Sequence, residues 1–318
     1  MTITTGKKKE KIDRLSELAA RNDERGVSLW KEAFRRLRRN PAAIVGAVIL
    51  GLFLLVAVLG PFLVPHAPDA QLWKGEIRLG DFPGPRGENW FGVDHIGRDE
   101  FSRMIVGARQ TLLVGVISTL IGLAVGSLIG GIAGAAAGLG GRWGRAVDNV
   151  LMRVIDMLLA MPSLLLAISI AALLGAGLET VMIAVGVVSV PVFARLLRGS
   201  MISQANSDYV LASVSLGVKK PKIALTHVVP NSLAPVIVQA TLTLATAIIE
   251  AAALSFLGLG NNDASIPEWG VMLADAQPYL DSAPRLAILP ALAIIVTALG
   301  FTLLGEAMRE ALDPKLRK

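Results

Sequence analysis

The sequence predicts an all-α membrane protein that crosses the bilayer six times and keeps both termini in the cytoplasm. Of its 318 residues, 53% are hydrophobic and only 18% are charged, which is too apolar for a soluble domain of this size. The apolar residues are gathered in stretches of about 20 residues or more, the length that a helix needs to cross about 30 Å of hydrocarbon. Lysine and arginine lie mostly on one side of these stretches, which indicates a fixed orientation.

A basic arm covers residues 1–41 and holds twelve of the 31 lysines and arginines. Such an arm is typical of a segment held against the cytoplasmic face of a membrane. Within it, residues 27–39 place four side chains on one helical face: Trp30, Ala33, Phe34 and Leu37. We expect this segment to lie flat on membrane lipid, with a soluble helix in a disordered tail as the alternative. Nucleic acid is not expected as a partner, because the arm leads directly into a membrane span.

The first span is predicted over residues 42–64, which contain no charged residue. The second span is predicted over residues 111–137. Glycine recurs there at every fourth position, in a series that continues just beyond the span: Gly122, Gly126, Gly130, Gly134 and Gly138. The spacing gives one helix face a smooth groove, and we expect another helix to pack closely against it. A general abundance of glycine in membrane helices is the alternative, but it does not explain the regular spacing.

Four further spans complete the predicted bundle. Residues 157–194 carry Glu179 as their only charge before Arg195 and are too long for one crossing. We therefore expect two spans there, joined by a turn at residues 175–177. The fifth span is expected over residues 232–258 and the sixth over residues 286–304. Six crossings put both termini on the same side of the membrane.

Basic residues set the predicted orientation. Four segments on the side of the termini hold 24 of the 31 lysines and arginines: 1–41, 142–153, 195–222 and 309–318. The opposite side holds a loop at residues 65–109, in which acidic residues nearly balance the basic ones. Because an excess of basic residues marks the cytoplasmic side, both termini are predicted to be cytoplasmic.

The outer loop at residues 65–109 carries a cluster of charges at Asp94, Arg98 and Asp99. The cluster could bind a metal ion or a partner surface, or it could stabilise the loop through its own ion pairs, which is the commoner situation. No metal site is expected elsewhere in the chain. The sequence has no cysteine, and its three histidines lie at no spacing that suggests a shared ion.

The inner loop at residues 199–230 predicts a helix, a turn and a second helix. Residues 209–216 are a helix candidate that Gly217 would end, and Pro221 permits a second helix to begin soon after. A short, partly apolar helix beside the lysines at positions 219, 220 and 222 is suited to enter a groove on a soluble partner. A solvated connector is the alternative that composition leaves open.

This inner loop resembles the EAA loop of ABC importer permeases, whose pattern is Glu-Ala-Ala, three residues, Gly, nine residues and Ile-x-Leu-Pro. The corresponding positions here are Leu211, Ala212, Ser213, Gly217, His227, Val229 and Pro230. The first of these replaces the glutamate of the pattern, and the third replaces its second alanine.

Other stretches resemble the branch of this family that imports dipeptides, oligopeptides and nickel. They are Asp-Tyr-Val from Asp208, FGVDHIGRD from Phe91, GARQTLLVG from Gly107, EAAALSFLGLG from Glu250 and LGEAMREALDPKLR from Leu304. Together with the inner loop they cover most of residues 30–317. The resemblance implies the fold of a type I importer permease, with the permease core at residues 110–308.

The resemblance also implies partners and a mechanism. In this family a homologous second permease subunit pairs with the first, two ATP-binding subunits dock beneath them, and an extracytoplasmic binding protein delivers substrate. The inner loop is then the coupling helix, and its residues toward the ATPase are Asp208, Tyr209, Ala212, Ser213, Gly217, His227 and Pro230. We expect the location to be the cytoplasmic membrane of a prokaryote.

The chain is expected to be a transport subunit and not an enzyme. It lacks the G-x-x-x-x-G-K-[ST] phosphate loop, so ATP and Mg are expected to be bound by the partner subunits, and this chain has no expected cofactor. An intramembrane enzyme is disfavoured because no cysteine or histidine lies in an expected span.

Glu250 is the one acid well inside an expected span. An ionisable group at that depth is a candidate for function, because leaving it unpaired in hydrocarbon is costly. Glu250 could line the translocation path and meet an ammonium group of the substrate, or it could bond to a neighbouring helix.

The expected function is ATP-driven import of short peptides. A permease of the same type for nickel or another small solute is the alternative within the family. An ion-gradient-driven secondary carrier is the alternative from another class. It is disfavoured because the sequence shows neither inverted repeats nor several acids at mid-depth.

Overall fold

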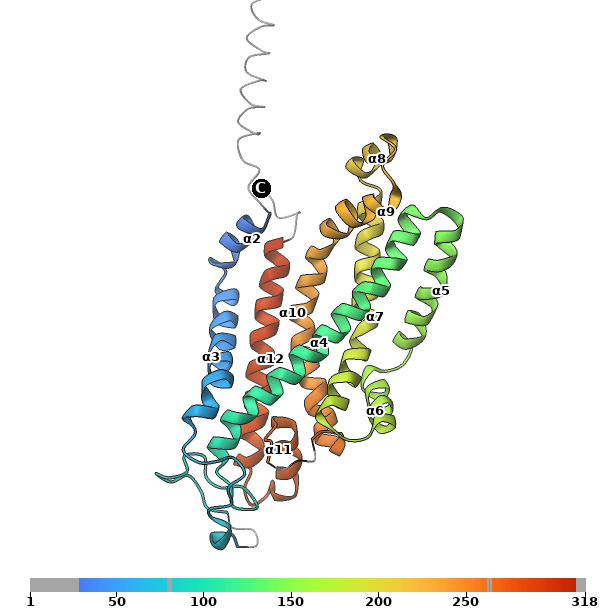
Figure 1. Cartoon of the computed structure of the whole chain (residues 1–318). Coiled ribbons are helices and arrows are strands. Elements are labelled where there is room, and N and C mark those ends of the chain that lie inside the picture. Colours follow the sequence, from blue (N-terminus) through green and yellow to red (C-terminus); the bar gives the residue numbers. More distant parts are fainter. Residues whose placement is uncertain (1–28, 79–81, 262, 264, 313–318) are drawn as a thin grey trace, which may run out of the picture.

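The computed structural model describes residues 29–78, 82–261, 263 and 265–312. Most of the basic arm, the end of the tail and the side chain of Trp30 lie outside the described part. The described chain is a bundle of long helices with short helices at both ends (Figure 1). Its only β pairing is an isolated bridge between Val93 and Asp99. The all-α fold class is therefore confirmed for these residues.

The helices follow one another along the chain with few long connections. Their bounds are α2 Leu29–Leu37, α3 Pro41–Leu63, α4 Glu100–Leu139, α5 Gly141–Leu159, α6 Ser163–Leu174, α7 Leu178–Ala205, α8 Asp208–Ser215, α9 Lys220–Ile223, α10 Val229–Leu254, α11 Trp269–Ala276 and α12 Arg285–Leu312. Two π-helical segments, Ala224–Val228 and Ser255–Leu259, extend α10 at its two ends. As a result, Lys220–Leu259 is one long helix.

Six crossings can be traced through the described residues. Five helices are long and apolar enough to span a membrane: α3, α4, α7, Lys220–Leu259 and α12. The sixth crossing is the pair α5 and α6, which passes the same test together and is bent by 93° at its break. The predicted number of spans is confirmed when this bent pair is counted as one.

The prediction that residues 142–153 form a loop on the side of the termini is wrong. These residues belong to helix α5, so the third crossing begins earlier than expected. Hydropathy missed this helix because charged residues interrupt it. Two of those charges are paired with α7: the Asp148 carboxylate lies 2.5 and 2.7 Å from Arg198 nitrogens, and Asp156 lies 2.6 Å from Arg195. The pairs compensate for charges that hydropathy counts as costly.

Several helices are longer than expected. α4 begins at Glu100, about three turns before the predicted start, because the Asp99 carboxylate caps it by accepting the Ser102 N–H at 2.9 Å. The outer loop therefore ends at Asp99. α7 and α12 also run beyond the predicted ends of their spans, to Ala205 and Leu312.

Both ends of the described chain lie at the same end of the bundle. α2, α8 and the end of α12 share this end, whereas the outer loop and α11 lie at the other (Figure 1). The Asn40 side chain, which caps α3, also donates to Glu310 of α12 at 3.0 Å. Because basic residues concentrate at this end, we assign it to the cytoplasm.

The glycine series of α4 lies against α7, and this is the most extensive contact between two helices. A Cβ added at Gly126 would lie 2.5 Å from the Val190 carbonyl oxygen, and one at Gly130 would meet the backbone of Ala194. The other members of the series also face α7: Gly122, Gly134 and Gly138. Only glycine lets the two backbones approach this closely.

Replacing Gly130 by alanine should destabilise the protein, because the backbone of Ala194 cannot rotate away from the new Cβ. The expected loss is about 1–3 kcal/mol of folding free energy, measured as a lower unfolding temperature in detergent. The neighbouring Gly131 is the matched control, since a Cβ there meets nothing nearer than 3.8 Å. Gly131→Ala should leave the unfolding temperature unchanged or raise it. Equal losses in both variants would contradict the assigned contact.

Candidate functional site

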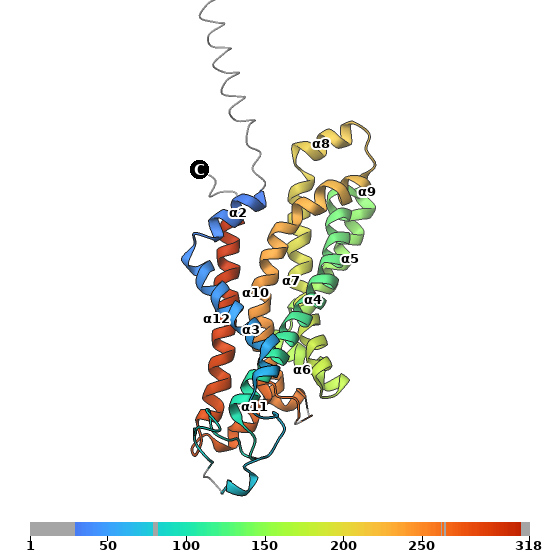
Figure 2. The same cartoon turned by 60° about the vertical axis from the view of Figure 1, so that its left-hand side comes forward.

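The first candidate site is the helix α8, which projects from the cytoplasmic end of the bundle (Figure 2). Asp208 lies in its first turn, where a negative charge interacts favourably with the helix dipole. The helix stops where Gly217 adopts a φ of +75°. In this turn the Gly217 N–H donates to the Val214 oxygen at 2.9 Å, and the Val218 N–H donates to the Ser213 oxygen at 3.1 Å. The predicted helix and its glycine stop are confirmed.

One buried side chain attaches α8 to the bundle, and the rest of its apolar surface is uncovered. Val210 is only 1% exposed and packs with Ile223 in a cluster that also contains residues of α7 and α10. Leu216 is 83% exposed, and Leu211 and Val214 are exposed as well. An uncovered apolar surface on a projecting helix is suited to bind a soluble partner.

The predicted coupling residues lie on three segments. Those between 208 and 217 belong to α8 and its turn, whereas His227 lies in Ala224–Val228 and Pro230 in the first turn of α10. The structure brings the rings of Tyr209 and His227 together, edge to face, with centroids 6.4 Å apart. The Tyr209 hydroxyl also donates to Gln204 of α7 at 2.7 Å. The connection between α8 and the long helices is therefore both apolar and polar.

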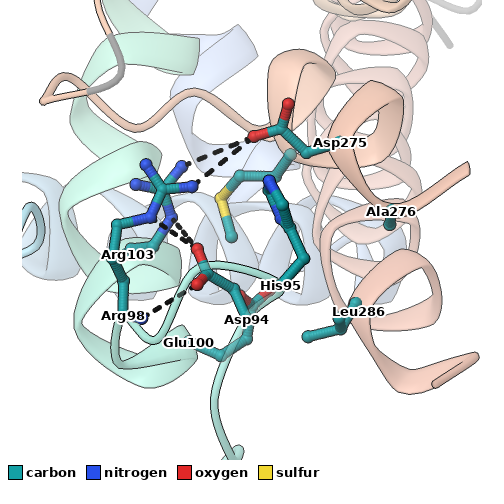
Figure 3. A pocket seen from close by; sticks show the side chains of 9 residues that line it. Asp94, His95, Arg98, Glu100, Arg103, Asp275, Ala276 and Leu286 are labelled. Carbon is teal, nitrogen blue, oxygen red and sulfur yellow. Dashed lines mark hydrogen bonds and ion pairs between the residues drawn. The ribbon is translucent and has the colours of Figure 1, made fainter. Parts of the chain in front are cut away.

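The second candidate site is the charged cluster of the outer loop, in which the side chains of Arg98 and Arg103 lie between Asp94 and Asp275 (Figure 3). The Asp94 carboxylate accepts the Ile96 and Arg98 backbone N–H groups at 3.0 and 2.8 Å. It also lies 2.5 Å from the Arg98 Nε and 3.6 Å from the Arg103 Nε. Asp94, Arg98 and Arg103 are buried. Such a cluster is sensitive to the loss of any member, because the remaining charge is left in a low-dielectric site.

Asp275 of α11 joins the cluster from the other side, at 3.6 Å from Arg98 and 4.0 Å from Arg103 (Figure 3). Arg285, the first residue of α12, donates to the Pro83 carbonyl oxygen at 2.9 Å. These links connect the outer loop with α4, α11 and α12. The extracytoplasmic end is thereby held as one unit.

The geometry of the cluster is that of ion pairs formed by the protein itself. Asp94 and Arg98 are paired with each other, and Asp99 caps α4. Among the described residues, no group of three His, Cys, Asp or Glu side chains could hold a metal ion. Sequence reasoning missed Arg103 and Asp275. The available signal was the presence of arginines in an outer loop, where basic residues are scarce.

Glu250 is half-buried on α10 and accepts a hydrogen bond from the Ser163 hydroxyl at the start of α6. It is thus in contact with a neighbouring helix. The carboxylate has room for further hydrogen-bond partners.

Glu268 is a further buried acid, in the connection before α11. Its Oε1 accepts the Gly270 N–H at 3.2 Å and so caps that helix. The adjacent Trp269 is buried, and its Nε1 donates to the Met104 oxygen of α4 at 3.0 Å. Burial raises the pKa of Glu268, and the hydrogen bond from Gly270 acts in the opposite direction.

Two family models together cover most of the chain. Residues 126–318 match the model described as binding-protein-dependent transport system inner membrane component, and residues 28–80 match the N-terminal TM domain of oligopeptide transport permease C. The chain belongs to this family of permeases. It is an inner-membrane subunit of an ABC importer and has no enzymatic role of its own, as the sequence resemblance predicted.

Relatives match nearly the whole length of the chain. The dipeptide transport system permease protein DppC of Alkalihalophilus pseudofirmus is 43% identical over 299 residues, which cover 92% of this chain and 91% of the relative. The glutathione transport system permease protein GsiD of Shigella flexneri is 43% identical over 288 residues, or 91% of each chain.

A solved structure shares the fold. A chain of the MetNI methionine ABC transporter, in an inward-facing conformation, matches with a TM-score of 0.54 at 16% identity. The match covers 66% of this chain and 96% of that chain. At this identity the likeness concerns the fold alone, and it confirms the predicted type I importer permease class.

Replacing Asp94 by asparagine should cost about 3–5 kcal/mol of folding free energy, because it removes the nearest carboxylate from the buried Arg98. The unfolding temperature in detergent measures the loss. Glu76→Gln is the matched control, since it breaks an ion pair with Arg86 at 2.7 Å in which both side chains are about half exposed. That variant should lose less than about 1 kcal/mol. Similar losses would show that burial does not determine the strength of the cluster.

Glu268 predicts a pH dependence of stability. Folding raises the pKa of Glu268, so its carboxyl group contributes fully to the stability of the fold below the unfolded-state pKa of 4.5. This contribution is lost as the pH rises through the folded-state pKa. Glu268→Gln should therefore flatten the decline of the unfolding temperature above about pH 4.5. Glu88→Gln, at an exposed position, should retain the decline of the wild type. An unchanged slope in Glu268→Gln would refute the assignment.

Proposed function

We propose that this chain is the permease subunit of an ATP-driven importer of short peptides and that α8 couples it to the ATPase. The observation that carries the proposal is a projecting, apolar α8 on a permease fold whose own sequence has no phosphate loop. Relatives that are named for dipeptides and for glutathione, itself a short peptide, support the substrate class. A permease for nickel or another small solute remains the alternative within the family.

The attachment of α8 supports a mechanical role. Val210 belongs to a cluster that contains Phe193, Leu197 and Met201 of α7 and Val236 of α10. A force applied to α8 by a partner would therefore reach two of the long helices at once. Close packing transmits such a displacement because cores resist compression.

The proposal includes the rest of the assembly. A homologous second permease subunit pairs with this chain, two ATP-binding subunits bind ATP and Mg and dock on the α8 end, and an extracytoplasmic binding protein delivers the substrate to the other end. The permease core is at residues 110–308, and the coupling loop, predicted at 199–230, begins after α7 ends at Ala205. Asp208, Ser213 and Gly217 belong to the part of that loop that contacts the ATPase.

The substrate class can be tested through the binding protein. We expect the binding protein encoded with this permease to bind dipeptides or oligopeptides, and the reconstituted transporter to accumulate the same peptides when ATP is supplied. Calorimetry and uptake into proteoliposomes measure the two steps. Binding of nickel chelates without binding of peptides would favour the alternative.

Replacing Gly217 by valine should uncouple the transporter without preventing membrane insertion. A β-branched residue is strained at a φ of +75°, and the cost of about 1–2 kcal/mol would reshape the end of α8. We expect peptide transport and ATPase stimulation to fall together by about tenfold, the equivalent of 1.4 kcal/mol.

Gly199→Val is the matched control for Gly217→Val. Gly199 lies in α7 with open space around its Cα and without the left-handed backbone, so the same substitution should change neither activity by more than about twofold. Unaltered coupling in Gly217→Val would count against the docking role of α8.

A further inference from the structure

The exposed surface of the bundle differs between α3 and α10. Every exposed large side chain of α3 is apolar, which is typical of a helix that faces lipid. α10 carries polar side chains on an accessible face instead. Thr246 is exposed, and Gln239 and Glu250 are half-buried. We refer to Gln239, Thr246 and Glu250 as the polar face of α10.

The spacing and depth of these three residues define one continuous stripe. They lie at i, i+7 and i+11, which a period of 3.6 residues places on the same side of a helix. At 1.5 Å per residue, Glu250 lies about 13 Å from the outer end at Leu259 and Gln239 about 30 Å from it. The polar face therefore runs from the cytoplasmic boundary to the middle of the membrane. Polar groups at that depth are costly against lipid and are expected to face water or protein.

A break in the third crossing lies beside this stripe. α5 ends at Leu159, α6 begins at Ser163, and residues 160–164 are all exposed. Irregular backbone at membrane depth is tolerated only where it is buried in protein or lines a water-filled cavity. Helix α6 packs against α10, and Ser163 interacts with Glu250, so the break and the polar face of α10 meet. Two independent features thus indicate that the same surface faces water or protein and not lipid.

The ion pair just before the break supports this conclusion. Asp156 of α5 and Arg195 of α7 lie 2.6 Å apart, and each side chain is more than half exposed. Arg195 is about 26 Å along α7 from its outer end at Leu178. At this depth the pair lies close to the cytoplasmic boundary, where an exposed ion pair agrees with a surface that opens toward the cytoplasm.

Glu250 is the charged end of this surface. Among the described residues it is in no ion pair, and its hydrogen-bond partner Ser163 is neutral. A half-buried carboxylate with no basic partner favours a cationic ligand. A free peptide carries such a cation at its amino end.

We propose that the polar face of α10 and the α5–α6 break line the cytoplasmic half of the translocation path, and that Glu250 binds the ammonium group of the transported peptide. This assignment rests on the proposed function for its substrate class. The proposed path itself is argued from exposure and depth alone, so it applies to any hydrophilic substrate.

The absence of cysteine from the sequence makes the path directly testable. Thr246→Cys and Gln239→Cys, each in the transporter assembled with its partner subunits, should react with a membrane-impermeant maleimide. Leu52→Cys is the matched control, because Leu52 is 60% exposed near the middle of α3 on the lipid-facing side. We expect it to react at least about tenfold more slowly, since maleimides need a hydrated thiolate. Equal, slow reaction at all three positions would overturn the path.

The role of Glu250 is tested by protection against the same reagent. Alanylalanine at high concentration should slow the labelling of Thr246→Cys at least about threefold, whereas N-acetyl-alanylalanine, which lacks the ammonium group, should not. Adding Glu250→Gln to Thr246→Cys should abolish the protection, and adding Glu250→Asp should preserve part of it. A merely structural Glu250 predicts the same protection by both peptides, and that result would overturn the assignment.

The two proposals fail in different ways. If the wild-type transporter does not accumulate peptides in proteoliposomes, the peptide function fails, yet rapid labelling of Thr246→Cys would still establish the path. If peptides are transported and the Thr246→Cys thiol is not labelled, only the path fails. Glu179→Gln, at the exposed outer end of α7, is the control for charge and should change neither peptide uptake nor protection by more than about twofold.

Discussion

The close approach of α4 and α7 is the interaction on which the other parts of the structure depend. Lipid tails are as apolar as the helix surfaces, so helices gain little from hydrophobic burial and associate where their backbones can pack closely. The glycine series of α4 permits that approach over most of the length of α7. α5, α6 and α10 in turn pack on this pair. The position of the pair therefore determines where the broken crossing and the polar face of α10 can lie.

Charge compensation is the second constraint, and it separates two kinds of ionised group. Asp94 and Asp148 are buried and have arginine partners within hydrogen-bond distance. Such pairs hold segments in register, because either partner alone would be a costly buried charge. Glu250 has only a hydroxyl partner among the described residues. The proposed role in transport accounts for a side chain of this kind.

The two ends of the molecule differ in how they are held: ion pairs connect the outer end, whereas few contacts attach α8 at the inner end. Outside, Asp94, Asp275 and Arg285 connect the outer loop with three helices. Inside, α8 is attached mainly by Val210 and the ring contact between Tyr209 and His227. Under the proposed function, a force on α8 would act first on the cytoplasmic ends of α7 and α10, which border the inner half of the proposed path.

The sequence by itself determined the features that depend on local composition. Apolar length predicted the spans, the excess of lysine and arginine predicted the side of the termini, and Gly217 predicted the end of α8, because each signal is carried by neighbouring residues. The tertiary structure alone decided which distant groups meet. α5 could not be recognised as a helix within the membrane until Arg195 and Arg198 of α7 were seen to pair with its aspartates. The approach of Asp275 to Arg98 and that of Ser163 to Glu250 were hidden for the same reason: a buried charge is explained by its neighbours in space, and these are far away along the chain.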